Sequence, residues 1–189
     1  MMDALTELLL TISTAFLVPV ILLLLFFFAL TVAYFGGLIG EAITRWKYEK
    51  GFKKFVAALK ASPDKRIRME ELPALGGLPK KAFGSRSVDR EKLLDDLQIK
   101  SEQILGRLML GIRLGPILGL AGTLIPLGPA LVALSTGDVA ALSAKLVVAF
   151  TTTVLGLLVG GACFAMHSLR RRWYMQDLND IEFVLKRME

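Results

Sequence analysis

Two apolar stretches, GPILGLAGT at residues 115–123 and TTTVLGL at residues 151–157, decide the fold of this chain. Each lies within a run long enough to cross a bilayer, and each places small residues and hydroxyls near the middle of that run. Neither run contains a carboxylate. Together they predict a membrane protein that lines an ion path without holding the proton itself, so we expect the missing acid on a partner chain.

Charged residues are confined to blocks along the 189 residues, of which 54% are hydrophobic, and the mean hydropathy is +0.57. The uncharged gaps are 8–40, 114–137 and 146–169. A transmembrane helix needs about 20 apolar residues, so each gap can hold one. The sequence therefore predicts an all-α membrane protein with three transmembrane helices, long cytoplasmic helical extensions and a cytoplasmic C-terminal helix.

The first gap is longer than one span requires. At ~1.5 Å per residue it would reach about 50 Å as a helix, whereas the hydrocarbon core is about 30 Å thick. Pro19 suits the first turn of a helix and disrupts a helix interior. We therefore predict an outer interfacial helix at 1–17 and the first transmembrane helix at 18–42. The acidic start of the chain is unlike a signal peptide.

The rest of the chain divides by the same criteria. The predicted segments are a cytoplasmic helical region at 43–108, a second transmembrane helix at 109–134, an outer turn at 135–139, a third transmembrane helix at 140–167 and a cytoplasmic C-terminal helix at 168–189. Within the cytoplasmic region, 43–62 is expected to form an amphipathic helix. Residues 63–86 are rich in Pro and Gly and are expected to be a loop that tolerates shortening. Ser87 is the predicted N-cap of a helix that runs into the second span.

The distribution of Lys and Arg predicts the orientation. Sixteen of the 23 basic residues lie in 44–107, and five more follow the third span. Cytoplasmic segments carry such an excess, so the N-terminus is expected outside and the C-terminus in the cytoplasm, in the inner (cytoplasmic) membrane. The net charge of +6 is then explained by orientation and by contact with membrane lipids, and nucleic-acid binding is not expected.

Metal-binding and redox residues are scarce. Cys163 and His167 are each the single residue of their type. One cysteine and one histidine cannot form a disulfide framework or a zinc site, so no metal or cofactor is predicted. The cytoplasmic part is too small for a separate enzyme domain, so no enzymatic reaction is expected. H⁺ or Na⁺ would be a transported ion.

Small residues and prolines recur at helical spacing in the second and third spans. They are candidates for helix packing or for lining a pore: Gly115, Pro116, Gly119, Gly122 and Pro126 in the second span, Gly156 and Gly160 in the third. Glycines spaced this way let helices approach closely in lipid. Ordinary packing and a pore both remain open on this pattern.

Threonine hydroxyls lie near mid-membrane in both spans. Thr123, Thr152 and Thr153 are the candidate ion-pathway residues. A threonine can instead bond a carbonyl of its own helix, which would make it structural. Three consecutive threonines point about 100° apart, so residues 151–153 cannot all face one pore.

Lys145 is the one charge well inside a predicted span. Because it lies one or two turns from the outer face, its ammonium group could reach the interface. Alternatively it could repel ions or pair with a partner at the mouth of a pore.

The run P-x-L-G-L-x-G-T at 116–123, followed by a short turn and a Thr-rich span around Gly156, resembles the MotA/TolQ/ExbB proton-channel family over about residues 100–175. Three spans with a long cytoplasmic region are similar to the ExbB and TolQ branch. The resemblance implies that Thr123 and Thr153 face the central pore. ExbB-like chains have a Glu five residues before the third-span threonine, where this chain has Val148, and its Pro126 and Pro129 predict a bend in the outer half of the second span.

The resemblance also implies the partners. Family members form a homopentamer around a dimer of a single-span partner of the MotB, ExbD or TolR type, and that partner carries the protonatable Asp. The expected function is therefore that of a channel and stator subunit of a motor driven by the proton motive force. The alternatives are a non-conducting membrane scaffold and a small-solute carrier; the absence of inverted repeats argues against the carrier.

Overall fold

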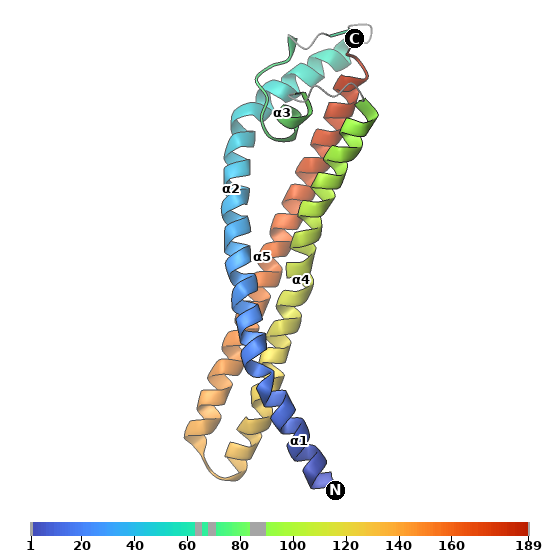
Figure 1. Cartoon of the computed structure of the whole chain (residues 1–189). Helices are drawn as coiled ribbons and strands as arrows, with labels where there is room; N and C mark the ends of the chain where they lie inside the picture. Colours follow the sequence, from blue (N-terminus) through green and yellow to red (C-terminus); the bar gives the residue numbers. More distant parts are fainter. Residues whose placement is uncertain (1, 63–65, 68–70, 84–89, 189) are drawn as a thin grey trace. The chain divides into compact units, whose positions relative to one another are not determined.

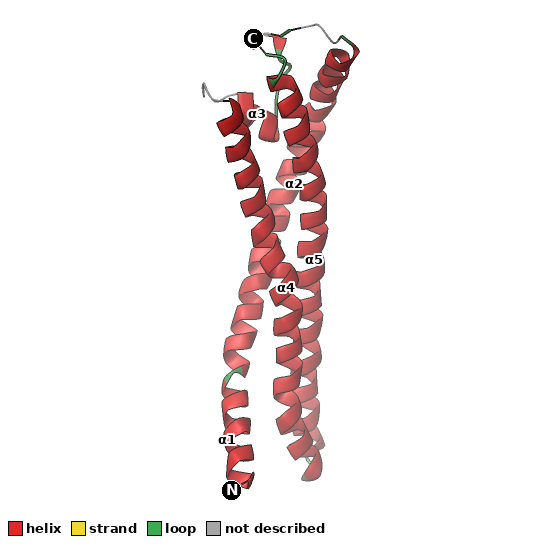
Figure 2. Ribbon diagram, turned by 90° about the vertical axis from the view of Figure 1, so that its right-hand side faces the viewer, coloured by secondary structure: helices red, strands yellow, loops and turns green. Residues whose placement is uncertain are grey.

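The computed structural model describes residues 2–62, 66–67, 71–83 and 90–188, and this part of the chain is helical apart from short connections (Figures 1 and 2). Its helices are α1 (Met2–Ala15), α2 (Leu17–Ala61), α3 (Gly77–Phe83), α4 (Arg90–Ser135) and α5 (Val139–Leu185). An isolated bridge between Ile67 and Met188 is the one β contact among the described residues. The predicted all-α class is confirmed.

Among the residues that the structure describes, three stretches are long and apolar enough to cross a membrane: Glu7–Ala61, Lys92–Ser135 and Val139–Leu185. Large hydrophobic side chains along them are exposed, for example Leu22 and Phe150. In water so much exposed apolar surface would be unfavourable, whereas in a bilayer it faces lipid or other helices. The prediction of three membrane-spanning helices is confirmed, and the chain is a multi-pass membrane protein.

The helix break near the N-terminus lies at Phe16. α1 ends at Ala15 and α2 begins at Leu17, so Pro19 occupies the first turn of α2, where its missing N–H would have had no intrahelical partner. α2 then continues to Ala61, so the amphipathic segment 43–62, which we predicted as part of a region distinct from the first span, is its direct continuation. Figure 2 shows the short break between α1 and α2.

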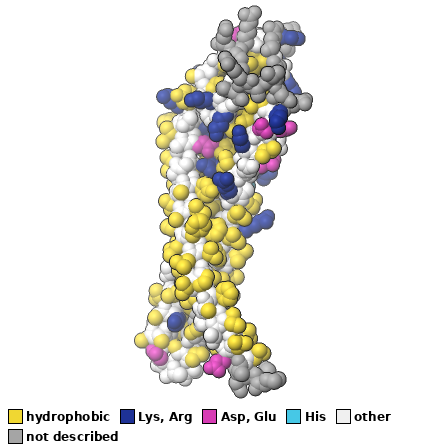
Figure 3. Space-filling view, viewed as in Figure 1, with side chains coloured by type: hydrophobic (Ala, Val, Ile, Leu, Met, Phe, Trp, Pro, Cys, Tyr) yellow, Lys and Arg dark blue, Asp and Glu magenta, His cyan; other side chains and the backbone are white. Residues whose placement is uncertain are grey.

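The chain folds into two compact units. The first, here called the apolar unit, comprises Met1–Tyr34 and Leu108–Ala165, and the second, the polar unit, comprises Phe35–Arg107 and Met166–Glu189. On the face drawn in Figure 3, hydrophobic side chains dominate the apolar unit, and most Lys and Arg side chains lie on the polar unit. The division follows the blocks of charge in the sequence.

Each of the helices α2, α3, α4 and α5 contributes side chains to the core of the polar unit. Its buried members include Phe52, Val56 and Leu59 of α2, Leu97 of α4, and Tyr174, Ile181, Val184 and Leu185 of α5. Most of these are the apolar stripes that helical spacing predicts in the sequence. Such stripes are expected to pack together because burial of apolar side chains is favourable.

One sequence-based expectation for the polar unit is wrong. Residues 63–86 were expected to be a loop, but Gly77–Phe83 form α3, and Leu78, Ala82 and Phe83 are buried in the core. The Phe83 ring lies 6.4 Å from that of Phe52, between ring centroids. Gly77 takes a positive φ of 63°, which allows the chain to turn into this short helix. The predicted N-cap Ser87 lies outside the described residues.

A tight turn joins α4 to α5. Gly137 has a φ of 74°, a left-handed conformation that suits glycine just after a helix. The next residue, Asp138, accepts a 2.9 Å hydrogen bond from the backbone N–H of Ala141 and so caps α5. The two helices therefore form an antiparallel hairpin within the apolar unit (Figure 1).

Candidate ion pathway

The α4–α5 hairpin is held together by backbone contact at glycines. A Cβ added at Gly156 of α5 would lie 2.5 Å from the carbonyl oxygen of Gly115 and 2.7 Å from the Cα of Gly119. Side-chain carbons do not approach other atoms so closely. The two helices can therefore meet at this distance only because these positions lack side chains.

The close contact extends along the hairpin in both directions. A Cβ added at Gly160 would lie 2.9 Å from ring carbons of Pro116, and one added at Gly122 would lie 2.6 Å from the Thr152 hydroxyl oxygen. The side chain of Pro126 is fully buried. The small residues and prolines singled out in the sequence thus lie on the sides of α4 and α5 that pack against other helices. Whether any of them also lines a pore stays a prediction.

Thr152 lies inside the helix contact. Its side chain is 6% exposed, and its hydroxyl donates to the Ala149 carbonyl of its own helix at 2.8 Å. The structure therefore places Thr152 against Gly122, between α4 and α5. Its predicted part in the ion pathway is untested.

Thr123 and Thr153 lie at the edge of the same contact and are partly exposed. Gly119 lies near both of them. It precedes Thr123 by one turn of α4, and a Cβ added at Gly119 would lie 3.4 Å from the Cα of Thr153 on α5. Their hydroxyls donate to carbonyls of their own helices, Thr123 to Leu120 at 2.6 Å and Thr153 to Ala149 at 3.3 Å. A hydroxyl that donates keeps its lone pairs, so both oxygens can still accept a hydrogen bond or coordinate a cation.

Other residues noted in the sequence lie around this hairpin. The side chain of Lys145 is exposed, and that of Val148 is partly exposed. Cys163 is buried, and its sulfur lies 3.5 Å from the Thr31 hydroxyl of α2. Within the described ranges, no cluster of three or more His, Cys, Asp or Glu side chains could hold a metal ion.

Residues 86–182 match the sequence pattern of the MotA/TolQ/ExbB proton channel family. The chain belongs to this family. The match covers all of α4 and most of α5, including the hairpin with its glycine contacts and the three candidate threonines. The MotA/TolQ/ExbB description is that of a channel-type membrane protein, which agrees with the three spanning helices. Searches among curated proteins and among solved structures gave no match.

Sequence reasoning missed a buried cluster of charges in the polar unit. The two terminal guanidinium nitrogens of Arg45 on α2, Nη1 and Nη2, donate to the two carboxylate oxygens of Asp177 on α5. Beside this pair, Arg170 donates to Glu41 at 3.1 Å, and the Tyr174 hydroxyl donates to the same carboxylate oxygen at 3.2 Å. The sequence shows basic residues that flank the spans, which we used for orientation only. No local pattern connects residues that lie 129 to 133 positions apart.

Burial sets the protonation behaviour of this cluster. Burial, and then the charge of Glu41, raises the pKa of Tyr174 to about 12. Burial also raises the pKa of Asp177 above its usual range, although the Arg45 guanidinium opposes that shift. Tyr174 therefore stays a neutral hydrogen-bond donor at neutral pH, and the cluster ties α2 to α5 through buried polar contacts.

Proposed function

We propose that this chain is the channel and stator subunit of an ion-driven motor in the inner membrane. Five copies surround two copies of a single-span partner, and the partner supplies the Asp that takes and releases the ion. The N-terminus lies outside, and the polar unit and C-terminus lie in the cytoplasm. Membership of a proton channel family is the observation that carries this proposal.

The chemistry of the hairpin supports a partner that brings its own acid. The spans of α4 and α5 contain hydroxyls and small residues, but no Asp or Glu lies between Arg113 and Asp138 or between Asp138 and Arg170. A hydroxyl can relay a proton through hydrogen bonds or coordinate a cation, but it cannot alternately bind and release a proton as a carboxyl group can. We therefore expect the group that binds and releases the proton on another chain.

The mechanism follows from this division of roles. The partner Asp is protonated from outside, moves past Thr123 and Thr153, and releases the ion on the cytoplasmic side. Each step favours rotation of the pentamer relative to the partner. A proton that crosses 100 mV releases about 2.3 kcal/mol, so several protons are needed for each useful unit of work.

Ion flux into vesicles tests the proposal. The chain is co-expressed with a single-span, Asp-bearing partner protein, and both the complex and the chain alone are reconstituted. We expect flux from the complex and almost none from the chain alone. Thr123→Val and Thr153→Val should each abolish flux while assembly persists, because valine keeps the shape of threonine and removes the hydroxyl.

Thr151→Val is the matched control. Thr151 is exposed on a neighbouring face of the same turn, and its hydroxyl donates to the Val147 carbonyl at 2.7 Å, so we expect flux to persist. Equal flux from the chain alone and from the complex would contradict the partner acid. Normal flux with valine at both 123 and 153 would make those threonines packing residues.

A non-conducting scaffold is the second candidate function. The observation that favours it is the set of glycine contacts, which would hold α4 against α5 whether or not ions pass. Assembly of the complex with no flux under any driving potential would support the scaffold.

A further inference from the structure

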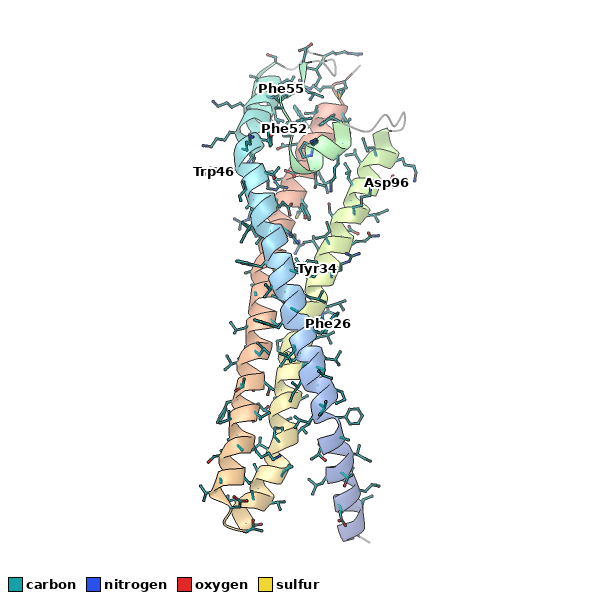
Figure 4. The ribbon with its side chains drawn as sticks, turned by 60° about the vertical axis from the view of Figure 1, so that its left-hand side comes forward. Phe26, Tyr34, Trp46, Phe52, Phe55 and Asp96 are labelled. Carbon is teal, nitrogen blue, oxygen red and sulfur yellow. The ribbon has the colours of Figure 1, made fainter. Side chains whose placement is uncertain are left out.

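A stripe of exposed side chains runs along α2 just after its uncharged segment. It consists of Ile43, Trp46, Lys47, Lys50 and Lys54, called here the α2 stripe. At 100° per residue these five positions fall within an arc of about 100° on one side of the helix. Ile43 is 63% exposed and Trp46 is 77% exposed, and Figure 4 shows Trp46 extending outward from α2.

The opposite side of the same helix segment is already occupied. Phe52, Val56 and Leu59 are buried in the core of the polar unit, and Arg45 is paired with Asp177. The polar unit therefore fixes the rotation of α2 so that the α2 stripe faces away from the core.

The lysines of the α2 stripe have no acidic partner among the described residues. The two acids of this segment are used elsewhere, because Glu41 binds Arg170 and Glu49 pairs with Lys53 at 2.5 Å. The Lys47 ammonium lies 5.4 Å over the Tyr48 ring, which leaves its charge uncancelled. The stripe thus presents uncompensated positive charge.

The order of side chains along the α2 stripe matches the profile of a bilayer surface. Going away from the span, the chain presents an isoleucine, a tryptophan and then the lysines. Tryptophan favours the level of the headgroups, and Lys47 and Lys50 lie about 1.5 and 6 Å beyond it along the axis. Lys54 lies about 12 Å beyond, close enough for its long side chain to reach the surface potential, which decays over about 8 Å.

We propose that the α2 stripe binds the headgroups of anionic phospholipids, with Trp46 at the interface and the three lysines on the phosphates. This binding does not depend on ion conduction, so it can hold even if the proposed channel function fails. It would set the depth and tilt of α2 in the membrane.

Quenching of Trp46 fluorescence by brominated lipids tests the proposal on the full-length chain in vesicles. The chain has two tryptophans, so the measurement uses a Trp173→Phe background, which keeps an aromatic ring beside Arg45. Brominated phosphatidylglycerol diluted in phosphatidylcholine is compared with the converse mixture. We expect stronger quenching by the anionic lipid, and the three lysines together should contribute a preference of at least about fivefold.

Three variants make the test specific. Lys47→Gln, Lys50→Gln and Lys54→Gln combined should lower the preference by at least about fivefold, whereas the corresponding triple change to Arg should retain it. The control removes the same charge elsewhere by combining Lys80→Gln, Lys81→Gln and Lys100→Gln at exposed positions, and it should retain the preference.

Three results would overturn the proposal. The first is equal quenching by anionic and zwitterionic lipid in the unsubstituted chain. The second is a loss of anionic preference in the control triple that equals the loss in the stripe triple. The third is an unchanged preference in the stripe triple. If the stripe triple kept its lipid preference but lost a co-purified protein, the stripe would be a protein interface instead.

Discussion

Gly122 of α4 lies directly against Thr152 of α5: a Cβ added at Gly122 would lie 2.6 Å from the Thr152 hydroxyl oxygen and 2.7 Å from its Cβ. One helix therefore accommodates a branched side chain because the other has none at that level. Because of this contact Thr152 is buried, whereas its neighbour Thr151 is exposed and Thr153 is partly exposed.

The first prediction concerns the Gly122–Thr152 pair. Gly122→Ala should lower the free energy of unfolding by about 1–3 kcal/mol, because the new methyl group has no space. Thr152→Gly should also destabilise, since it leaves a cavity and places glycine within a helix. The double variant should be more stable than the sum of the single effects predicts. Thermal unfolding in detergent micelles, followed by circular dichroism, measures all three, and strict additivity would show that the two residues do not compete for space.

The second prediction compares two glycines of α5. Gly156→Ala should destabilise the hairpin by about 1–3 kcal/mol or more, because the new methyl group would meet the α4 backbone. Backbone atoms cannot move aside as a flexible side chain can. Gly161→Ala is the matched control. Apart from the adjoining residues and backbone of its own helix, no atom lies within 4 Å of a Cβ at that position, so the change should be neutral or slightly stabilising. Equal melting temperatures of the two variants would contradict the close helix contact.

The third prediction concerns the buried pair of Arg45 and Asp177, which are 7% and 9% exposed. Asp177→Asn should cost about 3–5 kcal/mol, because the buried Arg45 charge then keeps only the Glu41 carboxylate, whose oxygen lies 3.7 Å from the Arg45 Nε. Replacing both residues with apolar ones, by Arg45→Met and Asp177→Leu, should cost much less. Chemical unfolding of the purified chain measures both. A double variant as unstable as the single one would indicate that the charges have a role beyond mutual compensation.

The fourth prediction is a pH dependence from Tyr174. Burial, then the charge of Glu41, raises its pKa from 10.0 to about 12 in the folded chain. A raised pKa means that the folded state holds the proton more tightly than the unfolded state. The resulting stability is complete below pH 10 and is lost as the pH rises towards 12.

Ultraviolet absorbance measures this titration. Tyr174 should ionise near pH 12, and Tyr174→Phe should remove that late step. Persistence of the late step in the Tyr174→Phe chain would assign it to another phenol.

The fifth prediction concerns α3. Phe83→Ala should destabilise the polar unit by about 3–5 kcal/mol, since its ring is buried against Phe52 in the core. Deletion of Gly77–Phe83 should prevent the polar unit from folding. Lys80→Ala, at an exposed position of the same short helix, is the control and should have little effect. Unfolding that is unchanged by Phe83→Ala would restore the expectation of a dispensable loop.

Several parts of the fold could be predicted because they depend on local properties of the chain. A transmembrane span is a sum of residue hydropathies over about 20 positions, so the uncharged gaps identify all three. The stripe containing Phe52, Val56 and Leu59 follows from helical spacing alone. Pro19 predicts a helix start within two residues of the observed one. The family could be recognised because its motif is contiguous in α4.

The sequence by itself determined that this chain is a helical membrane protein with polar helical extensions, and it pointed to the glycines and threonines of the second and third spans. Only the tertiary structure decided which of the three consecutive threonines packs against Gly122, that Arg45 pairs with Asp177, and that α3 joins the core. These contacts depend on the rotation and register of whole helices. A helix that is apolar on every side has no sequence pattern that shows which face meets its neighbour. Ion pairs between residues more than a hundred positions apart likewise have no local pattern.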